Sequence, residues 1–438
     1  AGRATAARKG PSVPAELRRL RDEGAIDPAA HDAHRALYDR ARSLERKLQG
    51  ARRIELGAVR RTLDGVAARR LLIPSRLPSL FLTLERNVRW WSTGPLLAPG
   101  RRLSFAGSEL VWQYYKGEGI QLQVLASFGK LNGLWQGKTF DDRLAELLDE
   151  LLALPTERAG GLAWEYHFTF NGGAPPWVSG LAQGTAVQAL ARAAIRLQRK
   201  DEVMPVALRA LGIFETRPPE GVRVDDGDGA HYLIYSFAPR FRVLNGFAQA
   251  VIGLHDFAGY ANDPRARALA DAGDRVARRE APTFDTGAWS LYSRGSLTRE
   301  SDLGYHKLVR DFLAGLCART GAEPYCVTRD HFTGYLRQKP AVEVLTRRVR
   351  GGTSTKLRFR LSKISRVGVE VRRGGRLVLS RPAFLGARGS RFVGWDVPRT
   401  AGRYDVRITA VDLAGNVGNG AGAVEVLAPK RKAKGERP

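Results

Sequence analysis

Two tyrosines stand close together in the polar stretch FDTGAWSLYSRGSLTRESDLGYH, and the second of them is followed at once by a histidine. A phenol can accept or donate a proton near neutral pH if neighbouring cations pull its pKa below the free value of about 10. Three basic side chains lie within this stretch or just after it and could also bind a carboxylate. The residues concerned are Tyr292, Tyr305, Arg294, His306 and Arg310. Groups of these types can perform general acid–base chemistry, but their spacing alone equally fits tyrosines packed in a core with satisfied hydroxyls.

Two further stretches place aromatic residues just before a predicted helix. In WEYHFTFNGGAPPWVSGLAQGTAVQALARA, Glu165 stands among Trp164, Tyr166 and Trp177. In HYLIYSFAPRFRVLNGF, Tyr235 precedes the helical pattern. Aromatic ring faces stack on the apolar faces of pyranosides, so loops of this kind suit a sugar ligand. The alternative for each aromatic taken singly is a packed core side chain whose polar group is satisfied.

Other kinds of chemistry find no local template in this sequence. GxSxG, HExxH, a phosphate-binding Walker loop and GxGxxG after a strand are all missing. None of the seven histidines is paired at metal-ligand spacing, so neither a cofactor nor a metal is expected. Two cysteines are too few for a zinc ribbon or a disulfide scaffold. Cys317 and Cys326 could form one disulfide in an oxidising compartment or remain ordinary thiols.

The net charge of +27, from 71 Lys and Arg against 44 Asp and Glu, is unusually high. Such a field favours polyanions, namely nucleic acid, anionic membrane or acidic polysaccharide, although it could also serve solubility alone. No run of 18 apolar residues occurs, which predicts that no segment spans a membrane. The chain opens AGRATAARKG, without an initiator Met or an apolar signal core, and is therefore expected to be a processed or trimmed product.

The elements that must position these residues change character along the chain, and together they predict an α+β multidomain protein. Leu and Ala at helical spacing predict a basic helical arm first, and short runs broken by Pro and Gly then predict strands. Successive helices follow, separated by Gly- and Pro-rich loops, which suggests an α/α toroid with its site on the loops at one end. The predicted ranges are 1–72 for the arm, 73–137 for the short strands and 138–338 for the toroid.

The pattern alternates with period two after Pro340. The segments KLRFRLSK, VGVEVRR, RLVLS and YDVRITAVD alternate, and a hairpin turn at Gly374 and Gly375 joins two of them. Residues 340–428 are therefore predicted to form an independently folding β-sandwich of immunoglobulin type. Residues 429–438 are basic and lack a core-forming pattern, so a disordered tail is predicted there.

Five motifs in the middle of the chain, taken in order, resemble the C-terminal catalytic domain of the D-glucuronyl C5-epimerase family. They are YYKGEGIQLQVLASFGKLNGLW, PWVSGLAQGTAVQALARA, VLNGFAQAVIGLHDF, DTGAWSLYS and the final Tyr-His pair of the opening stretch. Their order and spacing match over about residues 114–335, which is more specific than any single motif. The resemblance covers neither the N-terminal arm nor the predicted sandwich.

The resemblance implies that Tyr235, Tyr292 and Tyr305 are catalytic, with the last two flanking one sugar. Where the animal enzymes carry an acidic pair before the first of these tyrosines, this chain has Leu233 and Ile234, and Glu165 is the proposed substitute base. The implied substrate-binding residues are Arg294, His306, Arg310, Trp164, Tyr166, Trp177, Gln183 and Asn245.

The activity implied by the resemblance is inversion at C5 of glucuronate residues in an acidic polysaccharide such as heparosan. The C5 proton lies next to a carboxylate, and inversion needs a base on one face of the sugar and a proton donor on the other. A secreted or cell-surface enzyme is expected, without a cofactor, a nucleic-acid partner or a membrane span. The oligomeric state stays open, and a homodimer is one of the possibilities. Two alternatives remain: a polysaccharide lyase, in which the same carbanion expels its 4-O-substituent, and a non-catalytic glycan-binding protein on an epimerase scaffold.

Overall fold

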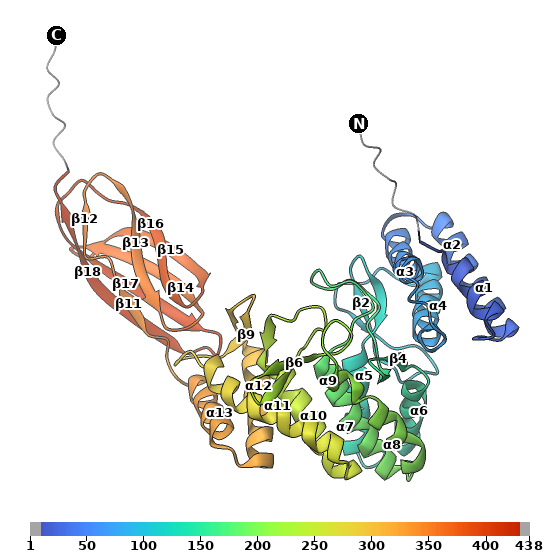
Figure 1. Cartoon of the computed structure of the whole chain (residues 1–438). Helices are drawn as coiled ribbons and strands as arrows, with labels where there is room; N and C mark the ends of the chain where they lie inside the picture. Colours follow the sequence, from blue (N-terminus) through green and yellow to red (C-terminus); the bar gives the residue numbers. More distant parts are fainter. Residues whose placement is uncertain (1–9, 430–438) are drawn as a thin grey trace, which may run out of the picture. The chain divides into compact units, whose positions relative to one another are not determined.

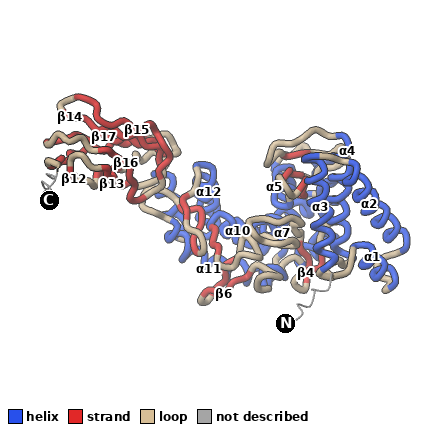
Figure 2. The backbone as a smooth tube through the Cα atoms, turned by 90° about the horizontal axis from the view of Figure 1, so that it is seen from above, coloured by secondary structure: helices blue, strands red, loops and turns tan. Residues whose placement is uncertain are grey.

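The computed structural model describes residues 10–429 (Figure 1), so the predicted basic tail lies almost entirely outside the described residues. The chain divides into two compact units, Ala1–Ala277 and Arg278–Pro438. Helices dominate the first unit, whereas the second combines helices with a C-terminal part made of strands (Figure 2). A mixed helical and sheet fold is thereby confirmed.

The first unit opens with helices, as the sequence predicts, but they do not form a separate arm. The buried carboxylate of Glu55 accepts hydrogen bonds from the Tyr114 hydroxyl at 2.7 Å and from the backbone N–H groups of Gly117 and Gly119 at 2.9 to 3.0 Å. This carboxylate ties the third helix to a hairpin far along the chain, which makes the helices an integral part of the unit. The helices are α1 (Val13–Asp22), α2 (Pro28–Lys47) and α3 (Gly50–Ala68).

The prediction of strands from residue 73 onward is wrong for its first part, because Leu77–Thr93 forms helix α4 after the short 3-10 helix Pro74–Arg76. The segment reads as an apolar run broken by prolines. Pro78, however, lies in the first turn of the helix, where a missing N–H costs nothing. The buried side chains recur every three to four residues, which is helical spacing: Leu77, Leu80, Phe81, Leu84, Val88 and Trp91.

Strands do occur in the second part of the predicted region, where three short antiparallel strands form one sheet. The strand pattern then ends earlier than expected, because Val124, Phe128 and Leu131 are buried at helical spacing. The elements are β1 (Arg102–Leu103), β2 (Trp112–Tyr115), β3 (Gly119–Leu122) and α5 (Val124–Gln136).

Helix α7 (Gly180–Arg196) lies at the centre of the rest of the unit and packs against α5 and α10 (Leu244–Ala261). The α7–α10 contact needs glycine on both sides, since a Cβ on Gly253 would clash with the carbonyl oxygen of Gly184. The close crossing brings the loops that precede the two helices together. The remaining elements are α6 (Asp141–Leu152), β4 (Thr156–Arg158), β5 (Gly161–Ala163), α8 (Lys200–Arg209), α9 (Gly212–Glu215), β6 (Arg223–Asp226), β7 (Gly229–Tyr232), β8 (Phe241–Val243) and α11 (Pro264–Glu280).

The second unit begins with a β-hairpin and a helical pair. A disulfide between Cys317 and Cys326 joins the two helices, which answers the question that the sequence left open. The predicted helical domain 138–338 is thus divided between the two units, and closure into a toroid stays a prediction. The elements are the 3-10 helix Ala281–Phe284, β9 (Leu291–Gly295), β10 (Arg299–Glu300), α12 (Leu303–Thr320) and α13 (Glu323–Tyr335).

The C-terminal strands form two sheets that enclose one hydrophobic core, as the period-two pattern predicts. Trp395 and Tyr404, one from each sheet, meet in this core with ring centroids 5.8 Å apart. Strands β11–β13–β16 form one sheet and β12–β18–β17–β14–β15 the other. Their bounds are Val342–Val344 (β11), Arg348–Arg350 (β12), Ser354–Leu361 (β13), Ser365–Arg373 (β14), Arg376–Gly386 (β15), Gly389–Asp396 (β16), Gly402–Asp412 (β17) and Val417–Leu427 (β18).

Candidate functional site

The structure brings Tyr292 and Tyr305 together, with ring centroids 4.7 Å apart and ring planes at 56°. Tyr292 lies on β9 and is 8% exposed, whereas Tyr305 lies in the first turn of α12 and is 39% exposed. The Asp302 side chain caps α12 by accepting a hydrogen bond from the Tyr305 N–H at 2.8 Å, which sets where the helix begins. The pair therefore offers one sheltered and one accessible phenol.

The two rings are too close together to hold a pyranose stacked between their faces. A pyranose stacked between two aromatic faces needs about 7 Å, twice a carbon–carbon contact of ~3.5 Å. The distance between ring centres does not locate the two hydroxyl groups, so the expectation that Tyr292 and Tyr305 flank one sugar stays a prediction.

A cation that the sequence pattern did not single out lies over the Tyr292 ring. The guanidinium carbon of Arg299 is 4.4 Å from the centre of the Tyr292 ring. The antiparallel register of the hairpin places Arg299 opposite Ser293, next to Tyr292, and Ser293 closes the hairpin by donating to the Leu297 carbonyl at 2.8 Å. A hairpin reading of SLYSRGSLTRES would have pointed to this arginine.

The two arginines chosen from sequence lie in other surroundings. Arg294 is exposed, with its guanidinium carbon 5.7 Å from the centre of the Phe284 ring, so it is accessible to a ligand. Arg310 pairs with the neighbouring Asp311 at 2.6 Å, which offsets its charge. Of the two, Arg294 remains the better candidate for binding a carboxylate.

His306 is a structural residue, which corrects its predicted role as a cation that binds substrate. Its ring is 0% exposed and stacks on Trp289 at 3.7 Å. Nε2 lies 2.9 Å from the Phe332 carbonyl, which can only accept, so Nε2 carries the proton and Nδ1 accepts from the Ser290 hydroxyl at 2.7 Å. Burial lowers the pKa of His306 to about 4, so the ring is neutral near pH 7.

Glu165 is likewise structural, which corrects its predicted role as a base. Its buried carboxylate is paired with Arg76 at 2.6 Å and with Arg158 at 2.8 Å. Burial alone would raise the pKa of Glu165, but the hydrogen bonds and charges of these arginines outweigh burial and hold it below the usual value. A carboxylate so occupied has no free face for a substrate proton.

Four predicted sugar contacts in the first unit are also packed inside it. Trp164 donates its indole N–H to the Leu151 carbonyl at 2.8 Å, and Gln183 hydrogen-bonds the Trp164 backbone at 2.8 and 3.3 Å. Tyr166 stacks on Trp177 with centroids 4.2 Å apart. All four side chains are buried, so their aromatic and amide groups serve the core, the alternative noted for such residues above.

Partly exposed aromatics instead surround Tyr235 on the first unit. Phe237 and Phe241 lie nearly parallel to Tyr235, with centroids 5.3 and 6.3 Å away, and Phe170 meets it edge-on at 5.4 Å. The four rings are neither buried nor fully exposed, unlike Trp177 beneath them. We call Phe170, Tyr235, Phe237 and Phe241 the aromatic face. The two Phe residues that follow Tyr235 in HYLIYSFAPRFRV were the sequence feature that could have predicted this aromatic face.

Asn245 lies in the first turn of helix α10, four residues after Phe241 of the aromatic face, and is 5% exposed. Its Oδ1 atom has no hydrogen-bond partner among the described residues. An unsatisfied buried acceptor is costly, which keeps Asn245 as a candidate for contacting a ligand donor.

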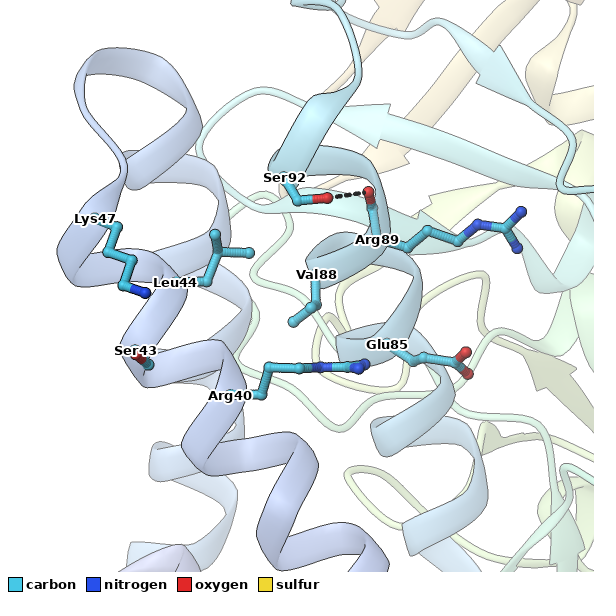
Figure 3. Close-up of a pocket in the computed structure, with 8 residues that line it drawn as sticks. All are labelled: Arg40, Ser43, Leu44, Lys47, Glu85, Val88, Arg89 and Ser92. Atoms are coloured by element: carbon cyan, nitrogen blue, oxygen red, sulfur yellow. Dashed lines mark hydrogen bonds between the residues drawn. The ribbon is translucent and has the colours of Figure 1, made fainter.

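A groove of about 500 Å³ between α2 and α4 lies outside these regions (Figure 3). Arg40 reaches across it and Lys47 points toward it, but the Arg89 and Glu85 side chains leave α4 on the other side. The cationic side chains of this groove therefore do not converge on one point, as an anion site would require. Within residues 10–429, no cluster of three or more His, Cys, Asp or Glu side chains could hold a metal, and no helix has the length and hydropathy of a membrane span.

The comparison with known proteins centres on the segment that holds all three tyrosines. Residues 159–334 match the family described as D-glucuronyl C5-epimerase C-terminus, so the resemblance to this family is confirmed there. A D-glucuronyl C5-epimerase of Caenorhabditis elegans is 28% identical over 185 residues, which cover 38% of this chain and 30% of the relative. The chain thus matches less than a third of that relative's length.

Two solved structures show weaker similarity. A selenomethionine derivative of a GH76 α-mannanase from Bacteroides thetaiotaomicron has a TM-score of 0.39 at 11% identity, covering 53% of this chain and 66% of the mannanase. A D-mannose isomerase has a TM-score of 0.35 at 12% identity, covering 48% of this chain and 59% of the isomerase. Scores this low carry no argument about fold or activity.

Proposed function

We propose that this protein is a D-glucuronyl C5-epimerase-like enzyme that inverts C5 of glucuronate residues in an acidic polysaccharide. The observation that carries the proposal is the contact between Tyr292 and Tyr305 under the charge of Arg299, inside the segment that matches the epimerase family. Two phenols and a cation at one place are the groups that proton transfer next to a carboxylate requires.

The reaction begins with removal of the C5 proton by a phenolate. The electron pair of the C–H bond moves toward the substrate carboxylate, and a nearby cation such as Arg294 or Arg299 stabilises the charge that develops there. A second group then returns a proton to C5 from the opposite face, which restores the charge balance and inverts the centre.

The polysaccharide partner is supported by two features of the chain. The aromatic face presents partly exposed rings of the kind that stack on pyranosides. The net charge of +27 favours an anionic polymer and steers it over long distances at low salt. Together they favour a polymer that carries both sugar faces and carboxylates.

Secretion or display at the cell surface is part of the same proposal. The Cys317–Cys326 disulfide supports it, because structural disulfides persist in oxidising compartments. The C-terminal sandwich is proposed to be of immunoglobulin type. In its support, the Tyr404 hydroxyl donates to the Thr400 carbonyl four residues upstream at 2.9 Å, a contact that resembles the tyrosine corner of such folds.

The test is incubation of the protein with heparosan in deuterated water. Deuterium at C5 together with iduronate in the product is the expected result. Unsaturated chain ends would identify a lyase instead. Binding without any exchange, at several pH values and over long incubations, would leave a glycan-binding protein and refute the enzymatic proposal.

A further inference from the structure

The second unit contains a lysine that is entirely buried. Lys363 lies between strands β13 and β14, and its side chain is 0% exposed. Its ammonium group pairs with Asp412 at 2.6 Å, donates to the Tyr335 carbonyl at 2.9 Å and donates to the Gln338 carbonyl. An ammonium group has three donors, and all three are used here.

The same ammonium group connects the sandwich to the region of the tyrosine pair. Nζ of Lys363 lies 5.2 Å from the centre of the Trp289 ring. Trp289 stacks face to face on His306, which is the neighbour of Tyr305 on α12. Trp289 also donates its indole N–H to the Ser301 carbonyl at 2.9 Å, across the base of the β9–β10 hairpin. The Lys363 ammonium group of the sandwich thus lies against the Trp289 ring. This ring in turn contacts α12 through His306 and the β9–β10 hairpin through Ser301, the two elements that carry the tyrosines.

A second connection runs in the opposite direction, from the hairpin to the sandwich. Glu300 on β10 accepts backbone hydrogen bonds from Arg388 at 3.1 Å and from Ile364 at 3.4 Å. The Glu300 carboxylate is partly shielded from water, and this burial raises its pKa above the usual value. Its neighbour in the chain is Arg299, the cation over Tyr292. Glu300 therefore fixes the strand that carries this cation.

We propose that the C-terminal sandwich positions the groups of the tyrosine site. Lys363 and Glu300 are the positioning residues, and through them the sandwich holds Tyr292, Arg299 and Tyr305 in place. Neither residue touches substrate in this scheme. The inference rests on the proposed function for its catalytic consequence, but the structural coupling itself is independent of it. It also replaces the expectation that the sandwich folds as a separate module, because Lys363 finds its carbonyl partners outside residues 340–428.

The experiment uses the full chain with a graded set of substitutions. Glu300→Gln keeps one acceptor oxygen and loses the other, and Glu300→Ala loses both. Lys363→Met removes the ammonium group but keeps a long apolar side chain. Glu343→Gln is the matched control, since Glu343 is an exposed carboxylate of the sandwich that pairs only with Arg360 among the described residues.

Two readouts decide the matter. Amide hydrogen exchange of residues 289–301 should speed up in Glu300→Gln, further in Glu300→Ala and also in Lys363→Met, and stay unchanged in the control. In the C5 exchange assay, kcat should fall about 10- to 100-fold with KM within about twofold, because misplacement of reacting groups by about 1 Å costs rate and not binding. Glu300→Gln should recover part of the activity that Glu300→Ala loses.

The outcomes separate the two proposals. Unchanged hydrogen exchange of the hairpin in Glu300→Ala would overturn the positioning inference, whatever the activity. Faster hairpin exchange with unchanged kcat would show that the sandwich stabilises the hairpin without serving the site, which also overturns it. A wild-type protein without C5 exchange would refute the proposed function, and the hydrogen-exchange series would still decide the coupling. If Lys363→Met fails to fold, the Glu300 series decides alone.

Discussion

The guanidinium group of Arg299 lies over the Tyr292 ring, with its central carbon 4.4 Å from the ring centre. A positive charge at this distance favours the ionised form of a phenol. Arg299→Gln should therefore lower the rate of C5 exchange at neutral pH and move the rising part of the pH–rate profile to higher pH. Arg299→Lys should keep part of the rate.

The matched control is Arg403→Gln, which removes an exposed arginine of the sandwich that pairs with Asp405. Its profile should follow that of the wild type. A profile in Arg299→Gln with the same shape and position as the wild type would remove this cation from the mechanism.

Tyr305→Phe should abolish exchange of the C5 proton while leaving polymer binding nearly intact. The substitution deletes one hydroxyl and keeps the ring that contacts Tyr292. Loss of a general acid or base costs about 10² to 10⁴ in rate. The rate of deuterium incorporation and the affinity for heparosan are measured side by side, and undiminished exchange would exclude Tyr305 as a catalytic residue.

Phe237→Ala should weaken binding of the polysaccharide by a similar factor at low and high salt, because it removes a stacking ring and no charge. Binding by the wild type should weaken with salt, since exposed charges are screened beyond about 8 Å at physiological ionic strength. Titrations at two salt concentrations separate the two effects. Unaltered affinity in Phe237→Ala would argue against the aromatic face as the binding surface.

His306 should make the second unit sensitive to acid. The pKa of His306 is about 4 in the folded protein, against 6.5 for an exposed histidine. Between these two pH values the unfolded chain therefore binds a proton at this residue that the folded chain does not bind. The contribution of the neutral ring to the free energy of unfolding is fully present above pH 6.5 and is lost as the pH drops toward 4. At 1.36 kcal/mol per pKa unit, this loss amounts to about 3 kcal/mol.

Denaturation of wild type and His306→Gln at several pH values measures this effect. The variant should be less stable near pH 7 but lose less stability on acidification. His167 in the first unit is buried with a pKa of about 4 as well, so the difference between the two proteins, and not the wild-type slope, is the relevant quantity. Parallel pH dependences would contradict the assignment.

The double substitution Cys317→Ser and Cys326→Ser should destabilise the second unit by about 2 to 3 kcal/mol, the loop-closure value for a short loop. Thermal unfolding of the double variant, compared with the wild type with and without reductant, checks the value. The wild type in reductant should approach the variant. A reductant effect that persists in the double variant could not come from this disulfide.

The residue pattern by itself predicted the parts of this protein that depend on neighbours in the chain. Helical spacing marked α1 and α2, and alternation marked the strands after Pro340. The spacing of motifs singled out Tyr292 and Tyr305, which the hairpin and the cap of α12 bring together. The helices and strands depend on residues close together in the chain, and the tyrosines follow from the motifs of the resemblance. Neither prediction requires contacts between distant parts of the chain. Helix α4 was misjudged because Pro74 just before it and Pro78 in its first turn resemble the breaks between short strands.

Tertiary structure alone decided which polar and aromatic side chains are buried. Glu165 became a structural carboxylate because Arg76, 89 residues earlier in the chain, pairs with it. His306 became neutral because Trp289 and Phe332 enclose it, and Trp164 and Tyr166 were drawn into the core. The charge and accessibility of a side chain depend on the groups that surround it, and those groups come from elements whose pairing the linear order of residues does not specify.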